Sequence, residues 1–245
     1  MALDVDNMLY FADVSNAAVF SREQPNENQK SPEIQILIKD YEGMPLKGPT
    51  SITLQREENC LFVCDSGYFG TTSLNSPSGS LFIVDLDSKI CRPILLNCLS
   101  YPADLIYDET SGYAYLAETF SNRVLRLTQS TSGVYHTSVF HQFYGRVGPT
   151  AIAVDALGNI YVARFEFQNS EQEIDGIISV LNKDGYIVGE LTLPKLPEIT
   201  GMCIPSGKKA DTLYFTERNF HGILKVKLST FAAEIDKMLD QNKYF

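Results

Sequence analysis

One short pattern recurs five times along the chain and constrains its fold more than any other feature. It is an apolar, strand-forming stretch that ends in a polar side chain, as in Phe62-Val63-Cys64-Asp65. The polar ends are Asp13, Asp65, Glu118, Arg164 and Glu217. Successive copies lie 46 to 53 residues apart. Self-similarity at a nearly fixed period indicates a repeat architecture, in which each repeat is one supersecondary unit.

A second pattern precedes four of the copies and marks the start of another strand. It reads Pro49-Thr50-Ser51-Ile52, Pro102-Ala103-Asp104-Leu105, Pro149-Thr150-Ala151-Ile152 and Ile199-Thr200-Gly201-Met202. Its second residue lies 14 to 17 residues before the polar end of the next strand. A third apolar segment and a weaker fourth one follow, separated by turn signals such as Leu157-Gly158-Asn159. Four short antiparallel strands per unit are typical of a β-propeller blade.

The sequence therefore predicts an all-β chain, a β-propeller of four-stranded blades with five recognisable repeats. We assign residues 1–228 to the propeller domain and 229–245 to a short C-terminal helix packed on it, because apolar residues there have helical spacing. The first blade is predicted to be truncated, since Leu3-Asp4-Val5-Asp6 resembles Ile152-Ala153-Val154-Asp155 and the sequence thus begins inside an inner strand. Three arrangements stay open: a ring of five blades, a ring of six, or an open ring that another polypeptide completes.

Composition excludes two classes of partner. The formal net charge is −10, and no segment clusters the lysines and arginines that a nucleic-acid surface needs. The longest apolar runs are far shorter than the roughly 20 residues that span a bilayer. We expect neither nucleic-acid binding nor a membrane span.

The cysteines favour a reducing compartment. The chain has five, an odd number that allows no complete disulfide framework. It also has no Asn-x-Ser/Thr acceptor for glycosylation. These features predict an intracellular, cytoplasmic location.

The repeats also resemble a known family. Ser100–Leu127, which contains Tyr115-Leu116-Ala117-Glu118, resembles the strictosidine-synthase-like and SMP-30/gluconolactonase propellers. Gly148–Ala163 and Asp211–Glu217 look like later blades of these proteins and like NHL repeats. The resemblance extends from about Gly48 to Leu228 and implies the propeller fold. It implies activity less specifically, because one fold hosts enzymes and binding modules alike.

The resemblance implies a divalent cation, calcium or zinc, in the central channel of the family's lactonases. Its ligands are a first-blade Glu, an Asn in Pro-Asn-Gly cassettes and an Asp in a Pro-Asp-Gly cassette. At these cassettes the chain has Pro102-Ala103-Asp104 and Pro149-Thr150-Ala151, and the first-blade Glu has no counterpart. We therefore expect no metal and no cofactor. If calcium or zinc binds after all, Asp104, Asp65 and Glu118 are the candidate ligands.

Propeller geometry predicts where a site could lie. The polar strand ends should surround one mouth of the channel, because antiparallel neighbours place them beside the starts of the inner strands. The residues predicted to bind a partner at this face are Asp65, Glu118, Arg164, Glu217, Tyr68, Phe69, Phe165 and Phe167. An acidic face would favour a basic partner. The alternative is that each carboxylate caps the turn that follows it, as in Asp65-Ser66-Gly67.

Two functional hypotheses follow. The first is a non-catalytic propeller that binds unidentified protein partners as a scaffold or subunit, with no catalytic residues and with a partner that completes the ring as one possibility. The alternative is a divalent-metal-dependent hydrolase or lactonase of the SMP-30/gluconolactonase type with a rearranged site. Retention of calcium or zinc by the purified protein would favour the alternative.

Overall fold

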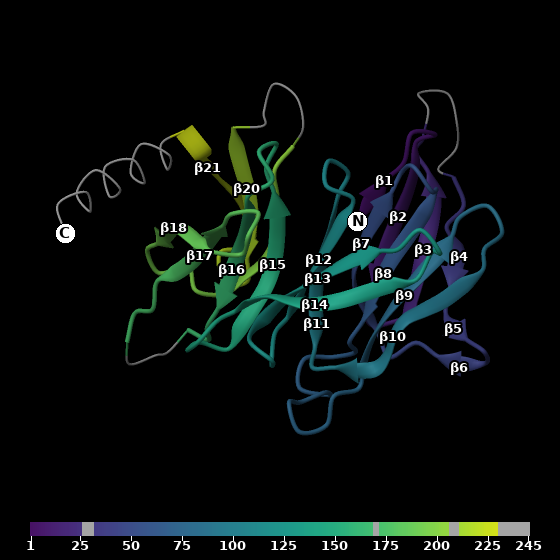
Figure 1. The fold of residues 1–245 in the computed structure, drawn as a ribbon, viewed down its shortest axis with the longest axis horizontal. Helices are drawn as coiled ribbons and strands as arrows, with labels where there is room; N and C mark the ends of the chain where they lie inside the picture. The colour runs from purple at the N-terminus through teal and green to yellow at the C-terminus, as the bar shows by residue number, and fades with distance from the viewer. Residues whose placement is uncertain (26–31, 169–171, 206–210, 230–245) are drawn as a thin grey trace. The chain divides into compact units, whose positions relative to one another are not determined.

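The computed structural model describes residues 1–25, 32–168, 172–205 and 211–229. Within these ranges the chain forms five antiparallel sheets and one small hairpin (Figure 1). The chain divides into two compact units, residues 1–121 with 125–138, and residues 122–124 with 139–245. The predicted all-β propeller of four-stranded blades is confirmed. The predicted C-terminal helix, 229–245, lies outside the described residues except for Ser229.

The first two sheets belong to the first unit. Sheet one has the order β1-β2-β3-β4 and contains Ala2–Leu3, Met8–Asp13, Ala18–Glu23 and Gln35–Ile38. Sheet two contains β7 to β10, which are Pro49–Gln55, Cys60–Asp65, Gly79–Asp85 and Cys91–Leu99. Between them lies the hairpin β5 (Asp40–Tyr41) and β6 (Met44–Pro45), which the repeat did not predict. Its two-residue strands are too short to show periodicity.

The remaining sheets follow the same order along the chain. Sheet three contains β11 to β14, which are Pro102–Asp108, Tyr113–Glu118, Arg123–Gln129 and Tyr135–Gln142. Sheet four contains β15 to β18, which are Gly148–Val154, Ile160–Phe165, Gly176–Leu181 and Ile187–Leu193. Sheet five has three described strands, β19 to β21, which are Ile199–Cys203, Thr212–Glu217 and Gly222–Lys227. No helix in the described ranges has the length and apolarity that crossing a membrane requires.

Alternating side chains of β8 explain why this strand is continuously apolar. Leu61 and Val63 belong to an apolar cluster with sheet one, whereas Phe62 and Cys64 belong to a second cluster with sheet three. All six residues of β8 are buried. A strand that packs on both faces reads as an unbroken apolar run, since neither face meets water. The five repeats are therefore a consequence of sheets that pack face to face.

The inner strands share a β-bulge near their first residue. Pairing with the second strand shifts between Pro49 and Ser51 in sheet two and between Pro102 and Asp104 in sheet three. The same shift follows Pro149 in sheet four and Ile199 in sheet five. The skipped residues are Thr50, Ala103, Thr150 and Thr200. A bulge leaves one residue unpaired and redirects its side chain, so these four positions are natural site positions.

We predict that Phe62→Ala lowers the free energy of unfolding by about 3–5 kcal/mol, because the side chain is fully buried. Its ring stacks on Tyr107 at 5.9 Å and meets Tyr135 edge-on at 5.7 Å. Urea denaturation measures the loss. The matched control is Leu157→Ala, whose side chain is 73% exposed and which should change stability by less than about 0.5 kcal/mol. A loss below about 1 kcal/mol for Phe62→Ala would contradict the packing described here.

Candidate functional site

Hydroxyl groups at the bulges connect neighbouring inner strands. Thr50 Oγ1 donates to the Pro102 carbonyl at 3.0 Å, and Thr150 Oγ1 donates to the Ile199 carbonyl at 2.8 Å. In both cases a threonine at the bulge of one sheet binds the carbonyl just before the bulge of the next. Ala103 holds the same position in sheet three and has no hydroxyl to donate. The cassettes recognised in the sequence thus have a structural role that their spacing alone did not reveal.

Asp104 is the acidic side chain closest to a bulge of the first unit. Its Oδ1 accepts a hydrogen bond from Ser51 Oγ at 2.6 Å and another from its neighbour's backbone, Leu105 N–H, at 2.9 Å. The residue is half-buried. Hydrogen bonds to an ionised acceptor are short and strong, and a 2.6 Å contact fits a charged carboxylate. Ser51 and Asp104 lie on β7 and β11, so adjacent sheets build this pair.

The buried thiol beside this pair is not a nucleophile. Burial raises the pKa of Cys64 well above its ordinary value, and the charges of Asp104 and Asp65 raise it further. The thiol is therefore neutral at physiological pH, and only the thiolate is a strong nucleophile. Reactive chemistry at this place falls to Asp104 and to the hydroxyls.

Three of the predicted face residues, Asp65, Glu118 and Glu217, are buried carboxylates, each at most 3% exposed. Asp65 accepts the backbone N–H groups of Lys47 and Gly48 at 2.8 to 3.0 Å. Glu118 accepts Ser100 N–H at 2.7 Å. Glu217 accepts Glu198 N–H at 3.3 Å. The partner lies 17 to 19 residues earlier in every case, on the segment that leads into the inner strand.

These bonds differ from the turn caps that the sequence suggested. Two strand ends do cap the residues after them: Glu217 Oε2 accepts Asn219 and Phe220 N–H at 2.8 Å, and Asp13 Oδ1 accepts Asn16 N–H at 3.0 Å. Asp65 instead caps a segment distant in sequence. The reason is the antiparallel pairing of Pro49 with Asp65, which places the end of the second strand beside the start of the first. Contact of these carboxylates with a basic partner stays a prediction.

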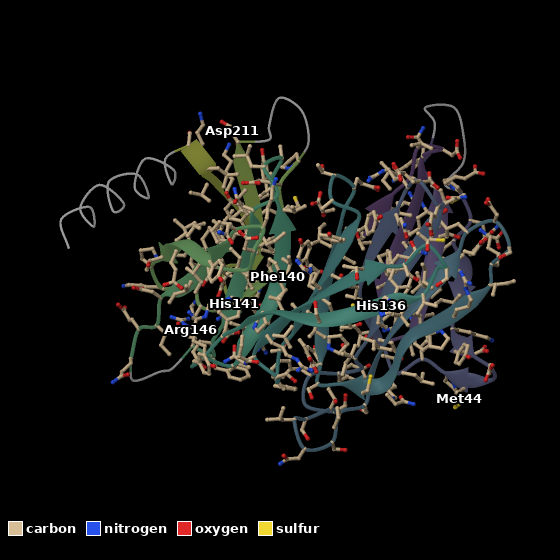
Figure 2. The ribbon with its side chains drawn as sticks, viewed as in Figure 1. Met44, His136, Phe140, His141, Arg146 and Asp211 are labelled. Carbon is tan, nitrogen blue, oxygen red and sulfur yellow. The ribbon has the colours of Figure 1, made fainter. Side chains whose placement is uncertain are left out.

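Arg164 occupies the equivalent strand end in sheet four and carries the opposite charge. Its Nη2 donates to the Tyr144 carbonyl at 2.6 Å, and its Nη1 lies 3.3 Å from Glu190 Oε1. The guanidinium also lies over the Phe143 ring, 5.0 Å from its centre. In the same unit, Arg146 Nη2 donates to the Asp175 carbonyl at 2.9 Å (Figure 2). A cation here binds carbonyls where the other sheets use a carboxylate to bind N–H groups.

The predicted aromatic residues separate into exposed and buried ones. Tyr68, Phe69 and Phe167 are 56%, 43% and 45% exposed. Phe165 is buried and meets Phe167 edge-on at 5.2 Å. The Phe69 ring centre lies 4.9 Å from that of Tyr101 and 5.0 Å from that of Phe120. These rings come from the loop after β8, the loop before β11 and the loop after β12, so three loops meet in one aromatic cluster. Tyr101 and Phe120 were missed by the sequence analysis.

Tyr101 had a detectable signal. It precedes Pro102, and the residues before Pro49 and Pro149 are Gly48 and Gly148. All three have positive φ, 137° for Gly48, 63° for Tyr101 and 143° for Gly148. A non-glycine residue in the left-handed region costs about 1–2 kcal/mol. Strain of this kind is concentrated at functional sites, which directs attention to the place where Tyr101 stands, three residues before Asp104.

The donors of the described residues do not fit the family's metal. No three His, Cys, Asp or Glu side chains in the described ranges lie in an arrangement that could hold an ion. At the bulge positions, Ala103 has only a methyl group and the other three residues are threonines. The hydroxyls of Thr50 and Thr150 already donate to carbonyls. Hard cations need several oxygen ligands, carboxylates above all. All three members of the sequence-based ligand set, Asp104, Asp65 and Glu118, accept hydrogen bonds from backbone N–H groups.

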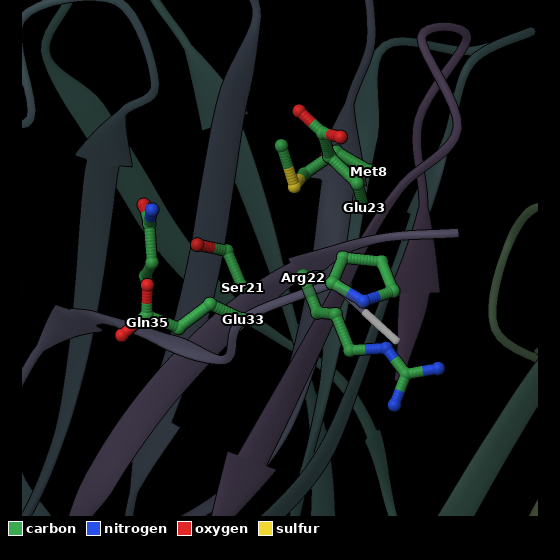
Figure 3. A pocket seen from close by; sticks show the side chains of 7 residues that line it. Met8, Ser21, Arg22, Glu23, Glu33 and Gln35 are labelled. Carbon is green, nitrogen blue, oxygen red and sulfur yellow. The ribbon is translucent and has the colours of Figure 1, made fainter. Parts of the chain in front are cut away.

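A pocket of about 390 Å³ lies on sheet one (Figure 3). It is lined by Met8, Ser21, Arg22, Glu23, Pro32, Glu33 and Gln35. Because Met8 pairs with Glu23, the pocket is at the opposite end of the sheet from Asp13. On β14, His141 (Figure 2) has its Nδ1 2.7 Å from the Gly185 carbonyl, a geometry that requires this nitrogen to carry the proton.

Comparisons with known proteins agree on one family. Residues 59–219 match the model of the SMP-30/Gluconolactonase/LRE-like region. Lactonase drp35 of Staphylococcus haemolyticus (strain JCSC1435) is 26% identical over 123 residues, which are 49% of this chain and 35% of that protein. Lactonase drp35 of Staphylococcus aureus (strain MRSA252) is 27% identical over 127 residues, 50% of this chain and 36% of that protein. The alignments thus span about a third of the length of these curated relatives.

Solved structures share the fold at low sequence identity. A putative gluconolactonase superposes with a TM-score of 0.71 at 20% identity, over 92% of this chain and 72% of that one. The calcium-binding protein regucalcin of Agrobacterium tumefaciens superposes with a TM-score of 0.67 at 17% identity, over 88% and 66%. A chain from a nidogen/laminin complex reaches 0.66 at 16% identity, over 93% and 74%.

We predict that Asp65→Ala lowers the free energy of unfolding by about 2–3 kcal/mol, because it leaves the buried N–H groups of Lys47 and Gly48 without their acceptor. Chemical denaturation at pH 7 measures the loss. Glu57→Ala, at an exposed site, is the control and should change stability by less than about 0.5 kcal/mol. Equal effects of the two variants would show that the cap contributes nothing.

The pH dependence of the same group has a definite sign. Burial raises the pKa of Asp65, against the opposing effect of the Lys47 and Gly48 N–H groups. The folded state then holds the proton more tightly than the unfolded state, so stability from this group is present below about pH 4 and is lost as pH rises through the folded pKa. The stability of the wild type relative to Asp65→Asn should therefore fall as the pH rises above about 4. A difference that grows over this range would reverse the assigned direction.

Proposed function

Because the chain belongs to the SMP-30/gluconolactonase/LRE-like family, we propose that it hydrolyses the ring ester of a lactone. Support comes from the relatives, which are lactonases, and from one feature of the geometry, the Ser51–Asp104 pair at the start of the inner strands. The lactonase is therefore preferred here, whereas the sequence alone favoured the non-catalytic scaffold. The substrate and the activity of the whole protein are part of the proposal.

Asp104 is assigned as general base. Its carboxylate takes a proton from a water molecule, whose oxygen adds to the lactone carbonyl carbon. The ring C–O bond then breaks, and the proton passes to the released ring oxygen, so the product is a hydroxy acid. A positioned base of this kind contributes roughly 10²- to 10⁴-fold to a rate. Ser51 orients the carboxylate through the 2.6 Å hydrogen bond and does not itself react.

The metal of the family enters no step of this mechanism, because the donors described above do not fit it. Tyr101, three residues before Asp104 in the chain, packs its ring against that of the exposed Phe69, with 4.9 Å between the ring centres. We assign these rings as the apolar surface against which a lactone ring lies.

The test is hydrolysis of gluconolactone and of an aromatic lactone by the purified protein. The release of protons from the acid product measures the rate. We expect Asp104→Asn to reduce kcat/KM at least about 100-fold, and Ser51→Ala roughly tenfold through loss of one hydrogen bond to a charged group. Asp184→Asn, at an exposed turn, is the matched control and should leave the rate unchanged.

The outcomes separate the parts of the proposal. Activity that is retained in EDTA and lost in Asp104→Asn supports it. Activity that requires added calcium or zinc supports a lactonase but overturns the metal-free assignment. Absence of hydrolysis with both lactones, with and without metal, overturns the proposed activity.

Protein binding is the second candidate, favoured by the exposure of Tyr68, Phe69 and Phe167 beyond the strand ends. Aromatic side chains are enriched at interfaces, and one structural neighbour comes from a nidogen/laminin complex. Asp65, Glu118 and Glu217 add little to an exposed acidic surface because they are buried, so the aromatic residues are the stronger basis for this candidate. Co-purification from the native source, repeated with Tyr68→Ala/Phe69→Ala, tests it: a partner lost with these side chains supports binding, and a partner retained removes them from the interface.

A further inference from the structure

The outer edge of sheet five differs from the equivalent edges of the other sheets. In sheets one to four, a fourth strand pairs with the third strand. In sheet five, no strand of the described ranges, which end at residue 229, pairs with the outer side of β21, the strand next to β20 (Figure 1). An unpaired edge presents a row of backbone donors and acceptors that can template another strand.

The hydrogen-bond pattern identifies the groups that point outward. Leu228 N–H donates to the Asp211 carbonyl at 2.7 Å, and Thr212 lies opposite Lys227 in the register of the pair. In an antiparallel ladder, hydrogen-bonded pairs alternate with non-bonded ones. Residues 224, 226 and 228 therefore bond to β20. The N–H and C=O groups of Ile223, Lys225 and Lys227 point away from it.

Side-chain burial shows the same incomplete edge. All but the last residue of β9, the third strand of sheet two, are buried. The residues of β21 alternate between half-buried and exposed, and Ile223 is 76% exposed. Leu224 and Val226 pack against the apolar cluster of the second unit and are still only half-buried. Both faces of β21 thus hold apolar surface that a further strand would cover.

Charge defines what such a strand should carry. Lys225 and Lys227 are exposed on one face, and the residues opposite them on β20 are the neutral Tyr214 and Thr212. Neither lysine forms an ion pair within the described part of the chain. Lysines on an edge strand also disfavour pairing with a strand that carries positive charge. Carboxylates directly across a strand pair would neutralise them.

We propose that β21 accepts a strand from another protein, an extended segment in which acidic and apolar residues alternate. The backbone of this segment bonds to the outward groups of residues 223, 225 and 227. Its acidic side chains lie beside Lys225 and Lys227, and its apolar side chains cover Leu224 and Val226. This is recognition by strand addition, in which main-chain bonds provide affinity and alternate side chains provide specificity. The lysines also repel basic strands, which protects the edge from unselective pairing.

The experiment uses the full chain and two labelled eight-residue peptides, one alternating valine and glutamate and one alternating valine and lysine. Fluorescence anisotropy measures binding, and hydrogen exchange follows the amides of Ile223, Lys225 and Lys227. We expect only the acidic peptide to bind and these three amides to become protected. The double variant Lys225→Glu/Lys227→Glu should bind the acidic peptide at least about tenfold more weakly and should bind the basic peptide. Lys183→Glu, at an exposed turn of the same unit, is the control and should change neither.

A second variant separates backbone pairing from charge. Ile223→Pro removes an outward N–H, keeps both lysines and leaves the ladder to β20 intact, so it should abolish protection of the edge amides while the circular dichroism spectrum is unchanged. If this variant does not fold, the lysine reversal still decides the question. The proposal is overturned if neither peptide binds, if both bind equally, or if the acidic peptide binds only after residues 230–245 are removed, since the chain would then occupy its own edge.

Discussion

Face-to-face packing of neighbouring sheets supports every other feature of the first unit. Phe62 and Leu61 are adjacent in sequence, yet they contact different sheets because successive side chains of a strand point to opposite faces. Each middle sheet can thus bury both faces only between two neighbours. That arrangement brings the inner strands side by side, close enough for Thr50 to bind the Pro102 carbonyl and for Ser51 to bind Asp104. The candidate site is therefore a product of the packing.

Polar residues at the strand ends serve the architecture before they serve any chemistry. The carboxylates of Asp65, Glu118 and Glu217 satisfy backbone N–H groups of the segment that enters each sheet. In sheet four, Arg164 at the same position donates to the carbonyl of the exposed Tyr144. A buried backbone group without a partner is costly, which is why the three carboxylates are needed at their strand ends. Asp104 differs from these carboxylates because its Oδ1 also accepts a serine hydroxyl from a neighbouring sheet.

The strands could be predicted because their signals are local. The apolar runs and the cassettes that begin with Pro49, Pro102 and Pro149 locate the inner, second and third strands. The hairpin of β5 and β6 was missed because two-residue strands carry no period. Ser51 was missed because its importance comes from a partner 53 residues away. Tyr101 could have been noticed as the one non-glycine residue in a position that is glycine before Pro49 and Pro149.

The sequence by itself determined the repeat, the all-β architecture and the family, since each depends on the order of apolar and polar residues along a strand. The tertiary structure decided which polar residues are structural and which are available. Asp65 and Asp104 are both aspartates within the same repeated patterns, but one is fully enclosed by backbone donors and the other is half-buried beside a serine of the next sheet. That distinction depends on contacts between segments far apart in the chain, and it exists only once the sheets have packed.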